Sequence, residues 1–284
     1  MSADPQHLLT EDHVRAFSPH RVNKQVRLRP IALPVEHGGW SLLLEPVALG
    51  LLLAPSPAGI FISVAAVGLF LARHPYKLAV RDWQAGRRGR RAILAQRFAL
   101  LYLSVALLAG SLAVKTGGIA FLLPLTFAVP FALVQLALDS VGRSRSLIAE
   151  LAGAAATGSL ATAVALGGGW PRATALALWV IMAARSVPTI LYLRARLRLM
   201  RQKPASRSLP VILHIAALSA IVGLSVLALA PWLAGVAMLF LLVRALRGLY
   251  SSGNQTTPQR LGMGELGYGL MTVVLTGVGY VFSL

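Results

Sequence analysis

The sequence contains no cysteine and carries little charge. Of its 284 residues, 13% are charged and 56% are hydrophobic, with a mean hydropathy of +0.70. The absence of cysteine excludes disulfides, thiolate nucleophiles, iron–sulfur clusters and cysteine-ligated zinc. A soluble protein of this length would have about a quarter of its residues charged. Apolar runs of about twenty residues recur along the whole chain, so we expect most of the surface to face lipid.

Acidic residues are the scarcer of the two charge types. Nine Asp and Glu stand against 27 Lys and Arg, which gives a formal net charge of +18. Such a surplus is also found in nucleic-acid-binding proteins, but here the basic residues lie in short patches between apolar segments. Patches of this kind are typical of loops that face the cytoplasm and its anionic leaflet. We therefore expect membrane lipids as partners and no nucleic acid.

The first thirty residues have no apolar core, so the sequence predicts no cleavable signal peptide. Residues 1–30 are interpreted as a polar, basic cytoplasmic tail and residues 31–284 as a transmembrane helical domain. Spans within a bilayer must pair their own backbone amides, which makes them helices. The fold class is therefore an all-α polytopic membrane protein with about nine spans, at 38–54, 57–72, 92–114, 117–138, 147–166, 171–193, 209–229, 231–250 and 264–284.

The connections between these spans alternate in charge. The N-terminal tail and every second connection hold 23 of the 27 Lys and Arg residues; the other four are Lys115, Arg172, Arg97 and Arg185. Only Lys115 and Arg172 fall in the opposite set of connections, because Arg97 and Arg185 lie inside spans. The positive-inside rule then predicts a cytoplasmic N-terminus and an external C-terminus.

Several charged residues are predicted inside the spans, where a charge costs several kcal/mol unless it is paired or hydrated. They are Glu45, Arg97, Glu150, Arg185 and Arg244. All but Glu45 fall in the cytoplasmic half, where a cavity open to the cytoplasm would hydrate them. The alternatives are structural ion pairing, for example of Glu150 with Arg185, and snorkelling, which we favour for Arg244. For Glu45 we favour a functional role because no neighbour is evident.

Two polar motifs stand at predicted cytoplasmic helix ends. In PVEHGGW, Glu36 and His37 precede two glycines, which permit close approach of a ligand. His37 is suited to proton transfer or anion binding, although a polar helix start anchored by Trp40 is an equal alternative. In RHPYKLAVRD, a short helix beginning at Pro75 would place Lys77 and Arg81 on one face.

The second motif also contains Arg73 and His74, which would stand at the start of this short helix. Together these basic groups suit a phosphate or carboxylate headgroup. We interpret the neighbouring arginines 87, 88, 90 and 91 as topology charge.

The sixth span continues the pattern. Arg185, Thr189, Tyr192 and Arg196 recur at helical spacing and predict one wall of a site, while Pro188 should kink the helix. A second stripe of arginines at positions 194, 198 and 201 is favoured as a snorkelling surface. His214, in the seventh span, is equally compatible with a core or a site position. The Gly, Ala, Ser and Thr residues of the fifth span indicate a tightly packed helix, and the glycines of the last span indicate the same.

The motifs PVEHGGWSLLLEPVALG, RHPYKLAVRDW and ARSVPTILYLRARLR resemble the YwiC-like family of bacterial membrane proteins. The resemblance implies a multi-pass protein of the bacterial cytoplasmic membrane. More distantly, nine helices and the start RPIALPVEHGGW are similar to the UbiA superfamily of intramembrane prenyltransferases. Members of that superfamily hold Mg²⁺ and an isoprenoid diphosphate on two Asp-rich motifs. Here the first motif position offers only Asp82 and the second only arginines, so no metal site of that kind is expected.

Three function hypotheses arise from these features. The first is a UbiA-like enzyme or lipid-binding relative, with a cytoplasm-facing cavity for an isoprenoid or other amphiphilic ligand that has an anionic headgroup. The second is a transporter or permease that uses Glu45, Glu150 and Arg185, and the third is a non-catalytic membrane assembly factor. No cofactor is assigned. The candidate catalytic residues are Glu36, Glu45, Asp82 and Glu150, and the candidate substrate-binding residues are His37, Arg73, His74, Lys77, Arg81, Arg97, Arg185 and Tyr192.

Overall fold

The computed structural model describes residues 28–33, 37–87, 89–250 and 257–283. Every regular element in these ranges is a helix. The helices are α1 (Arg29–Ala32), α2 (His37–Leu53), α3 (Pro57–Gln84), α4 (Arg90–Gly117), α5 (Leu122–Ser140), α6 (Leu147–Gly167), α7 (Arg172–Met200), α8 (Ser208–Val226), α9 (Trp232–Tyr250) and α10 (Pro258–Ser283).

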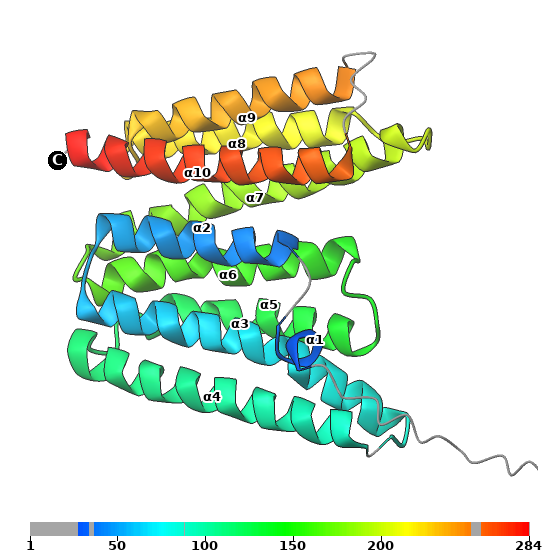
Figure 1. Ribbon diagram of the computed structural model, residues 1–284. Helices are drawn as coiled ribbons and strands as arrows, with labels where there is room; N and C mark the ends of the chain where they lie inside the picture. The colour runs from blue at the N-terminus through cyan, green and yellow to red at the C-terminus, as the bar shows by residue number, and fades with distance from the viewer. Residues whose placement is uncertain (1–27, 34–36, 88, 251–256, 284) are drawn as a thin grey trace, which may run out of the picture.

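Each predicted span corresponds to one of the helices from α2 to α10. These helices lie side by side and run along a common direction (Figure 1). Within the described residues, eight of them are long and apolar enough to cross a membrane. The ninth, α2, has a shorter apolar part at Gly39–Leu53. The prediction of an all-α polytopic membrane protein is confirmed.

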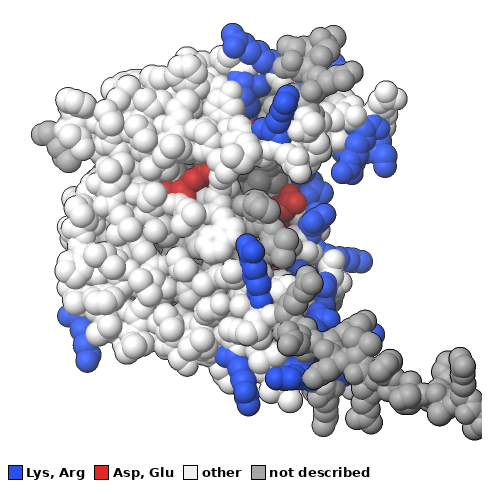
Figure 2. Space-filling view, in the orientation of Figure 1, with Lys and Arg blue, Asp and Glu red and all other residues white. Residues whose placement is uncertain are grey.

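The alternation of charge seen in the sequence is also present in the fold. The helices α3, α5, α7 and α9 finish at one end of the bundle, where α4, α6, α8 and α10 begin. We call this end the basic end, because Lys and Arg side chains gather there (Figure 2). Lys115, near the end of α4, and Arg172, at the start of α7, lie at the opposite end. Which end faces the cytoplasm remains a prediction.

The small residues of α6 place this helix in the centre of the bundle. It packs against α2, α5 and α7, and 13 of its residues are buried. Its approach to α2 is so close that a side chain at Gly50 would overlap Val164. Glycine and alanine allow such contacts between membrane helices. The predicted tight packing of this span is confirmed.

The last helix, α10, packs beside α2, the first long helix of the chain. It packs against both α2 and α9, so the N-terminal and C-terminal helices of the bundle share a flank that is visible in Figure 1. This contact brings residues near position 45 beside residues near position 265, which are far apart in the chain.

The structure corrects one expectation about α3. Pro75 does not begin a new helix, because α3 continues without interruption from Pro57 to Gln84. Proline removes one backbone hydrogen bond, but the surrounding turns of a packed helix continue past it. Pro188 likewise lies inside α7. As a consequence, Arg73, Lys77 and Arg81 occupy successive turns of one helix.

Candidate functional site

Each Asp and Glu within the described residues forms an ion pair with an arginine on another helix. The pairs are Glu45 with Arg185, Asp82 with Arg91, Asp139 with Arg73, Glu150 with Arg194, and Glu265 with both Arg185 and Arg244. The remaining four acidic residues of the chain, Asp4, Glu11, Asp12 and Glu36, lie outside the described residues. These ion pairs lie at different depths. The pairs of Glu45 and Glu265 share Arg185 and form one group in the middle of the bundle.

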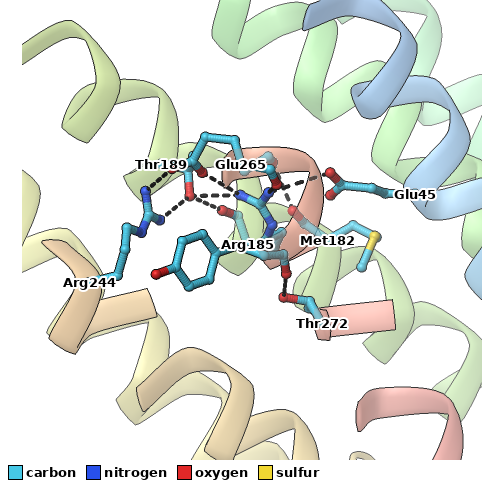
Figure 3. Close-up of polar contacts among 9 residues, drawn as sticks. Glu45, Met182, Arg185, Thr189, Arg244, Glu265 and Thr272 are labelled. Atoms are coloured by element: carbon cyan, nitrogen blue, oxygen red, sulfur yellow. Dashed lines mark hydrogen bonds and ion pairs between the residues drawn. The ribbon is translucent and has the colours of Figure 1, made fainter. Parts of the chain in front are cut away.

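This group, which we call the central network, consists of Glu45, Arg185, Thr189, Arg244 and Glu265 (Figure 3). Its members come from α2, α7, α9 and α10. Arg244 Nη1 donates to Glu265 Oε1 at 2.7 Å. Arg185 Nη2 donates to the Glu265 carbonyl oxygen at 3.0 Å, and Arg185 Nη1 lies 3.8 Å from Glu265 Oε2. Glu265 therefore links the two arginines.

Thr189 joins the same two arginines on their other side. Its hydroxyl accepts hydrogen bonds from Arg185 Nη1 at 2.9 Å and from Arg244 Nη2 at 3.1 Å. It donates to the Arg185 carbonyl oxygen at 2.7 Å. All the hydrogen-bonding capacity of this hydroxyl is thus used inside the network.

Glu45 is held more loosely than Glu265. Its Oε1 lies 3.4 Å from Arg185 Nη2, and its carboxylate rests against Gly269 of α10, where any larger residue would overlap it. The Glu45 side chain is 14% exposed, against 5% for Arg185. Acidic side-chain atoms are visible on the flank formed by α2 and α10 (Figure 2). The network therefore touches the surface of the bundle on the side that α2 and α10 share.

Aromatic rings enclose the arginine end of the network. The Arg244 guanidinium lies 4.2 Å from the ring centre of Tyr192 and 5.2 Å from that of Tyr268. Tyr192 in turn contacts the ring of His214 edge-on at 6.4 Å, and its hydroxyl presses on Gly248 of α9. Cations are attracted to aromatic faces most strongly where water is excluded.

His214 has a defined tautomer. Its Nδ1 lies 2.7 Å from the Pro210 carbonyl oxygen, and because a carbonyl only accepts, Nδ1 must carry the proton. Its Nε2 is buried and has no hydrogen-bond partner among the described residues. The ring therefore presents a free nitrogen beside the aromatic enclosure.

The central network lies inside the membrane-spanning helices, between their middle and the basic end. Arg244 is six residues before the end of α9 and Glu265 is seven residues after the start of α10, which places both about 10 Å from that end. Arg185 follows the start of α7 by 13 residues and precedes its end by 15, which places it about 20 Å from either end. Glu45 is eight residues from each end of α2. Two arginines and two glutamates give a formal charge of zero, and charges at such depth require pairing.

The structure brings together three of the predicted site residues: Glu45, Arg185 and Tyr192. One expectation about this region is wrong. Arg244 does not snorkel; its side chain is 5% exposed and pairs with Glu265 of α10, a helix that packs against α9. Glu150 forms an ion pair, as one of the alternatives held, but its partner is Arg194 at 2.8 Å and not Arg185.

The basic group on α3 holds helices together at the basic end. Arg73 donates through Nε to Asp139 of α5, whose side chain is 1% exposed. His74 Nε2 lies 3.0 Å from the Pro30 carbonyl oxygen of α1. Lys77 is half-buried, and Arg81 is exposed with its guanidinium beside Gly142. Two of the four predicted headgroup residues are therefore engaged with other parts of the protein.

The remaining predicted residues lie apart from the central network. Asp82 is buried and lies 3.6 Å from Arg91 of α4, so Arg91 has a partner within the protein, and its interpretation as topology charge stays a prediction. Arg97 is exposed on α4. Glu36 lies outside the described residues, and His37 begins α2 with its side chain outside them.

Two of the three arginines in the second stripe make contacts within the protein. Arg194 pairs with Glu150 and donates to the Arg145 carbonyl oxygen at 3.0 Å. Arg198 Nε donates to the Pro204 carbonyl oxygen at 3.0 Å. These contacts link α7 to the α5–α6 and α7–α8 connections, and the snorkelling role of the stripe stays a prediction.

Sequence reasoning missed Glu265 and Asp139. Both were assigned to the margins of spans, Glu265 as the second residue of the last span and Asp139 just after the fourth. A signal was present in the composition, because nine acidic residues stand against 27 basic ones. In such a chain each carboxylate in or beside a span has many basic side chains available as partners and is a site candidate in itself.

The segment from α2 to α6 supplies four of the five described acidic residues. Residues 33–165 match the family model described as YwiC-like protein. This match confirms the resemblance carried by PVEHGGWSLLLEPVALG and RHPYKLAVRDW, whereas ARSVPTILYLRARLR, at residues 184–198, follows the matched region. The YwiC-like segment contributes Glu45 to the central network, whereas Arg185, Arg244 and Glu265 follow it in the chain. No curated protein and no solved structure matches this chain.

Proposed function

We propose that this protein binds an amphiphile with an anionic headgroup at the central network, as a UbiA-like intramembrane enzyme or a lipid-binding protein. The observation that carries the proposal is the meeting of two arginines and two glutamates from four helices inside the bundle, with no side chain more than 14% exposed. Charged groups are rarely placed so deep unless they serve a ligand, an ion or a proton. Replacing such a network with apolar side chains often leaves stability unchanged or raises it, so stability alone is a weak reason for its presence.

The two arginines supply the chemistry for an anion. A guanidinium presents several N–H donors in a plane that matches carboxylate and phosphate oxygens. The Nε atoms of Arg185 and Arg244 are buried without a hydrogen-bond partner among the described residues. The Glu265 carboxylate already occupies an anion position between the two guanidinium groups. A headgroup of similar shape would bind by taking over one of these contacts.

The partial exposure of Glu45 supports an amphiphile over a water-soluble anion. A ligand dissolved in the bilayer would reach the network along the flank of α2 and α10 and leave its apolar tail among the lipids. An isoprenoid chain is the tail that the UbiA resemblance implies. At the basic end, Lys77 and Arg81 would attract the anionic head, together with Arg73 and His74 if these release their protein partners. This scheme places the basic end in the cytoplasm of a bacterial cell.

The carboxylates have different roles in this scheme, according to whether they belong to the central network. Glu45 belongs to it and would act on a bound headgroup as acid, base or cation stabiliser. Asp82 and Glu150 pair with arginines outside the network, and any catalytic role for them, or for Glu36, requires a ligand that extends to the basic end. Of the three residues in the transport hypothesis, Glu45 and Arg185 lie in the central network, whereas Glu150 pairs with Arg194 outside it.

Co-purification with variants on one helix tests the proposal. The full-length wild type, Arg185→Gln and Arg194→Gln would be purified in mild detergent, and bound amphiphiles would be compared by mass spectrometry. Arg194 is the matched control, since it is on α7 and forms a Glu ion pair outside the network. We expect one anionic amphiphile enriched in wild type and Arg194→Gln and lost in Arg185→Gln.

A second variant covers the case in which Arg185→Gln does not fold. Arg244→Lys keeps the positive charge but removes the planar pair of donors, and it should retain the fold while weakening retention of the amphiphile. If wild type and all variants carry the same amphiphiles in the same amounts, or if none is enriched, the proposal is wrong.

A further inference from the structure

The central network is electrically complete before any ligand enters. Its two arginines and two glutamates sum to zero formal charge, and none of the four side chains is more than 14% exposed. If a singly charged anionic headgroup bound between the arginines, the net charge of the site would change from zero to minus one. An uncompensated charge in a desolvated site costs several kcal/mol. Binding must therefore be accompanied by a compensating positive charge.

The two glutamates differ in how readily they lose their partners. Glu265 lies 2.7 Å from Arg244 and 3.8 Å from Arg185, so it keeps one arginine if the other turns to a ligand. Glu45 has a single ion pair among the described residues, with Arg185 at 3.4 Å. The Nε atom of the same Arg185 guanidinium is buried and has no hydrogen-bond partner among the described residues. A headgroup that engaged Arg185 would leave Glu45 as an isolated carboxylate (Figure 3).

We propose that binding of an anionic headgroup at Arg185 is coupled to the uptake of one proton by Glu45. The inference rests on the proposed function, because it needs a headgroup at the central network. One proton from water is transferred to a Glu45 carboxylate oxygen as the headgroup forms its contact with Arg185, and the site remains neutral. The reverse transfer accompanies release. The ligand class is thus an amphiphile with a singly charged head that enters together with a proton.

Among the described residues, few charged or titratable groups lie near Glu45. The charged groups that face it are Arg185 of α7 and Glu265 of α10, with Arg244 of α9 behind Glu265. From α10, Gly269 lies against its carboxylate. The part of α3 from Pro57 to Ala72 contains no titratable residue, and Glu150, the one charged residue of α6, pairs with Arg194. Tyr192 and Tyr268 contact the Arg244 guanidinium, and His214 contacts the ring of Tyr192.

The test uses an alkyl sulfonate, because a sulfonate keeps its single negative charge throughout the working pH range. Full-length protein in nanodiscs of zwitterionic phosphatidylcholine would be titrated with it between about pH 8 and about pH 5, with a chelator present. One proton taken up per ligand makes the affinity rise roughly tenfold for each unit that the pH falls, until Glu45 is protonated in the free protein. Glu45→Gln should bind at every pH as tightly as the wild type does at its lowest pH. The matched control Asp139→Asn changes a buried carboxylate at the basic end and should keep the wild-type pH dependence.

Proton uptake can be measured without any variant. In weakly buffered solution with a pH indicator, addition of the sulfonate to wild type should remove about one proton from solution per ligand bound. Saturable binding whose affinity is constant with pH would overturn the coupling and leave the proposed function standing. The same holds for Glu45→Gln binding with the wild-type slope. No saturable binding at any pH would overturn both.

Discussion

The central network and the Glu150–Arg194 pair contain the same chemistry in different settings. Both join α7 to another helix through an arginine and a glutamate. Arg194 and Glu150 are 39% and 33% exposed, so water is available to either partner if the pair breaks. Arg185 and Glu265 are 5% and 10% exposed, so little of either side chain is accessible to water. An exposed arginine–glutamate pair can therefore lose a partner to water, whereas the buried pair cannot lose one partner without leaving an unpaired charge.

This difference separates what the two regions contribute. An exposed pair contributes about 0–1 kcal/mol to stability. A buried pair contributes little beyond an apolar substitute, but its loss on one side leaves an unpaired charge at a penalty of about 3–5 kcal/mol. The pairs outside the central network thus hold helix ends together. At the charged positions of the network, a substitution that removes one partner leaves the other unpaired.

The largest expected effect comes from breaking the network at Arg244. Arg244→Gln removes the nearest partner of Glu265 and should lower the free energy of unfolding by about 3–5 kcal/mol. Thermal unfolding in detergent would measure the loss. The double variant Arg244→Gln with Glu265→Gln should recover much of it, since no unpaired charge is then left. A loss no larger than that of Arg194→Gln would remove the distinction between the two regions.

Gly269 tests how closely α10 must approach Glu45. A methyl group at this position would overlap the Glu45 carboxylate, so Gly269→Ala should destabilise the protein by about 1–3 kcal/mol. Gly267 on the same helix has nothing within 4 Å of an added Cβ. Gly267→Ala should therefore be neutral or stabilise by up to about 1 kcal/mol, because alanine favours helix. Equal effects of the two substitutions on thermal stability would contradict the predicted contact.

Asp139 shows whether burial or depth decides the effect. Its side chain is 1% exposed, yet it lies at the basic end and pairs with the partly exposed Arg73. Asp139→Asn keeps the shape but weakens a charge-assisted hydrogen bond, so we expect a loss of about 1–3 kcal/mol in the free energy of unfolding. A loss as large as that for Arg244→Gln would show that burial alone is decisive.

The smallest effect is expected at Glu150. Glu150→Gln leaves Arg194 with access to water and with its bond to the Arg145 carbonyl oxygen. The free energy of unfolding should fall by less than about 1 kcal/mol. A thermal shift comparable to that of Asp139→Asn would mean that this pair is less accessible to water than its exposure indicates.

Much of the fold follows from the sequence because its causes are local. The apolar runs predict the helices from α2 to α10, and the alternation of charged and uncharged connections predicts which ends gather at the basic end. The small residues of α6 predict its central place. By contrast, the continuation of α3 through Pro75 depends on packing that keeps a helix intact where one of its hydrogen bonds is missing.

Part of the site was predictable from the sequence as single residues, but the pairs that they form were not. Glu45 and Arg185 stand out because a charge inside an apolar run is costly wherever it lies. Their contact joins positions 140 residues apart in the chain, and no local pattern encodes it. Arg244 looked shallow because its distance from the end of α9 is short, and only the position of α10 shows that it is covered.

The most direct test of the account replaces the network with apolar residues. A variant with Glu45, Arg185, Arg244 and Glu265 all changed to Met has no unpaired charge, so its thermal stability should equal or exceed that of the wild type. It should at the same time lose the anionic amphiphile that co-purifies with the wild type. A stable variant that still carries this amphiphile would show that the central network is not the binding site.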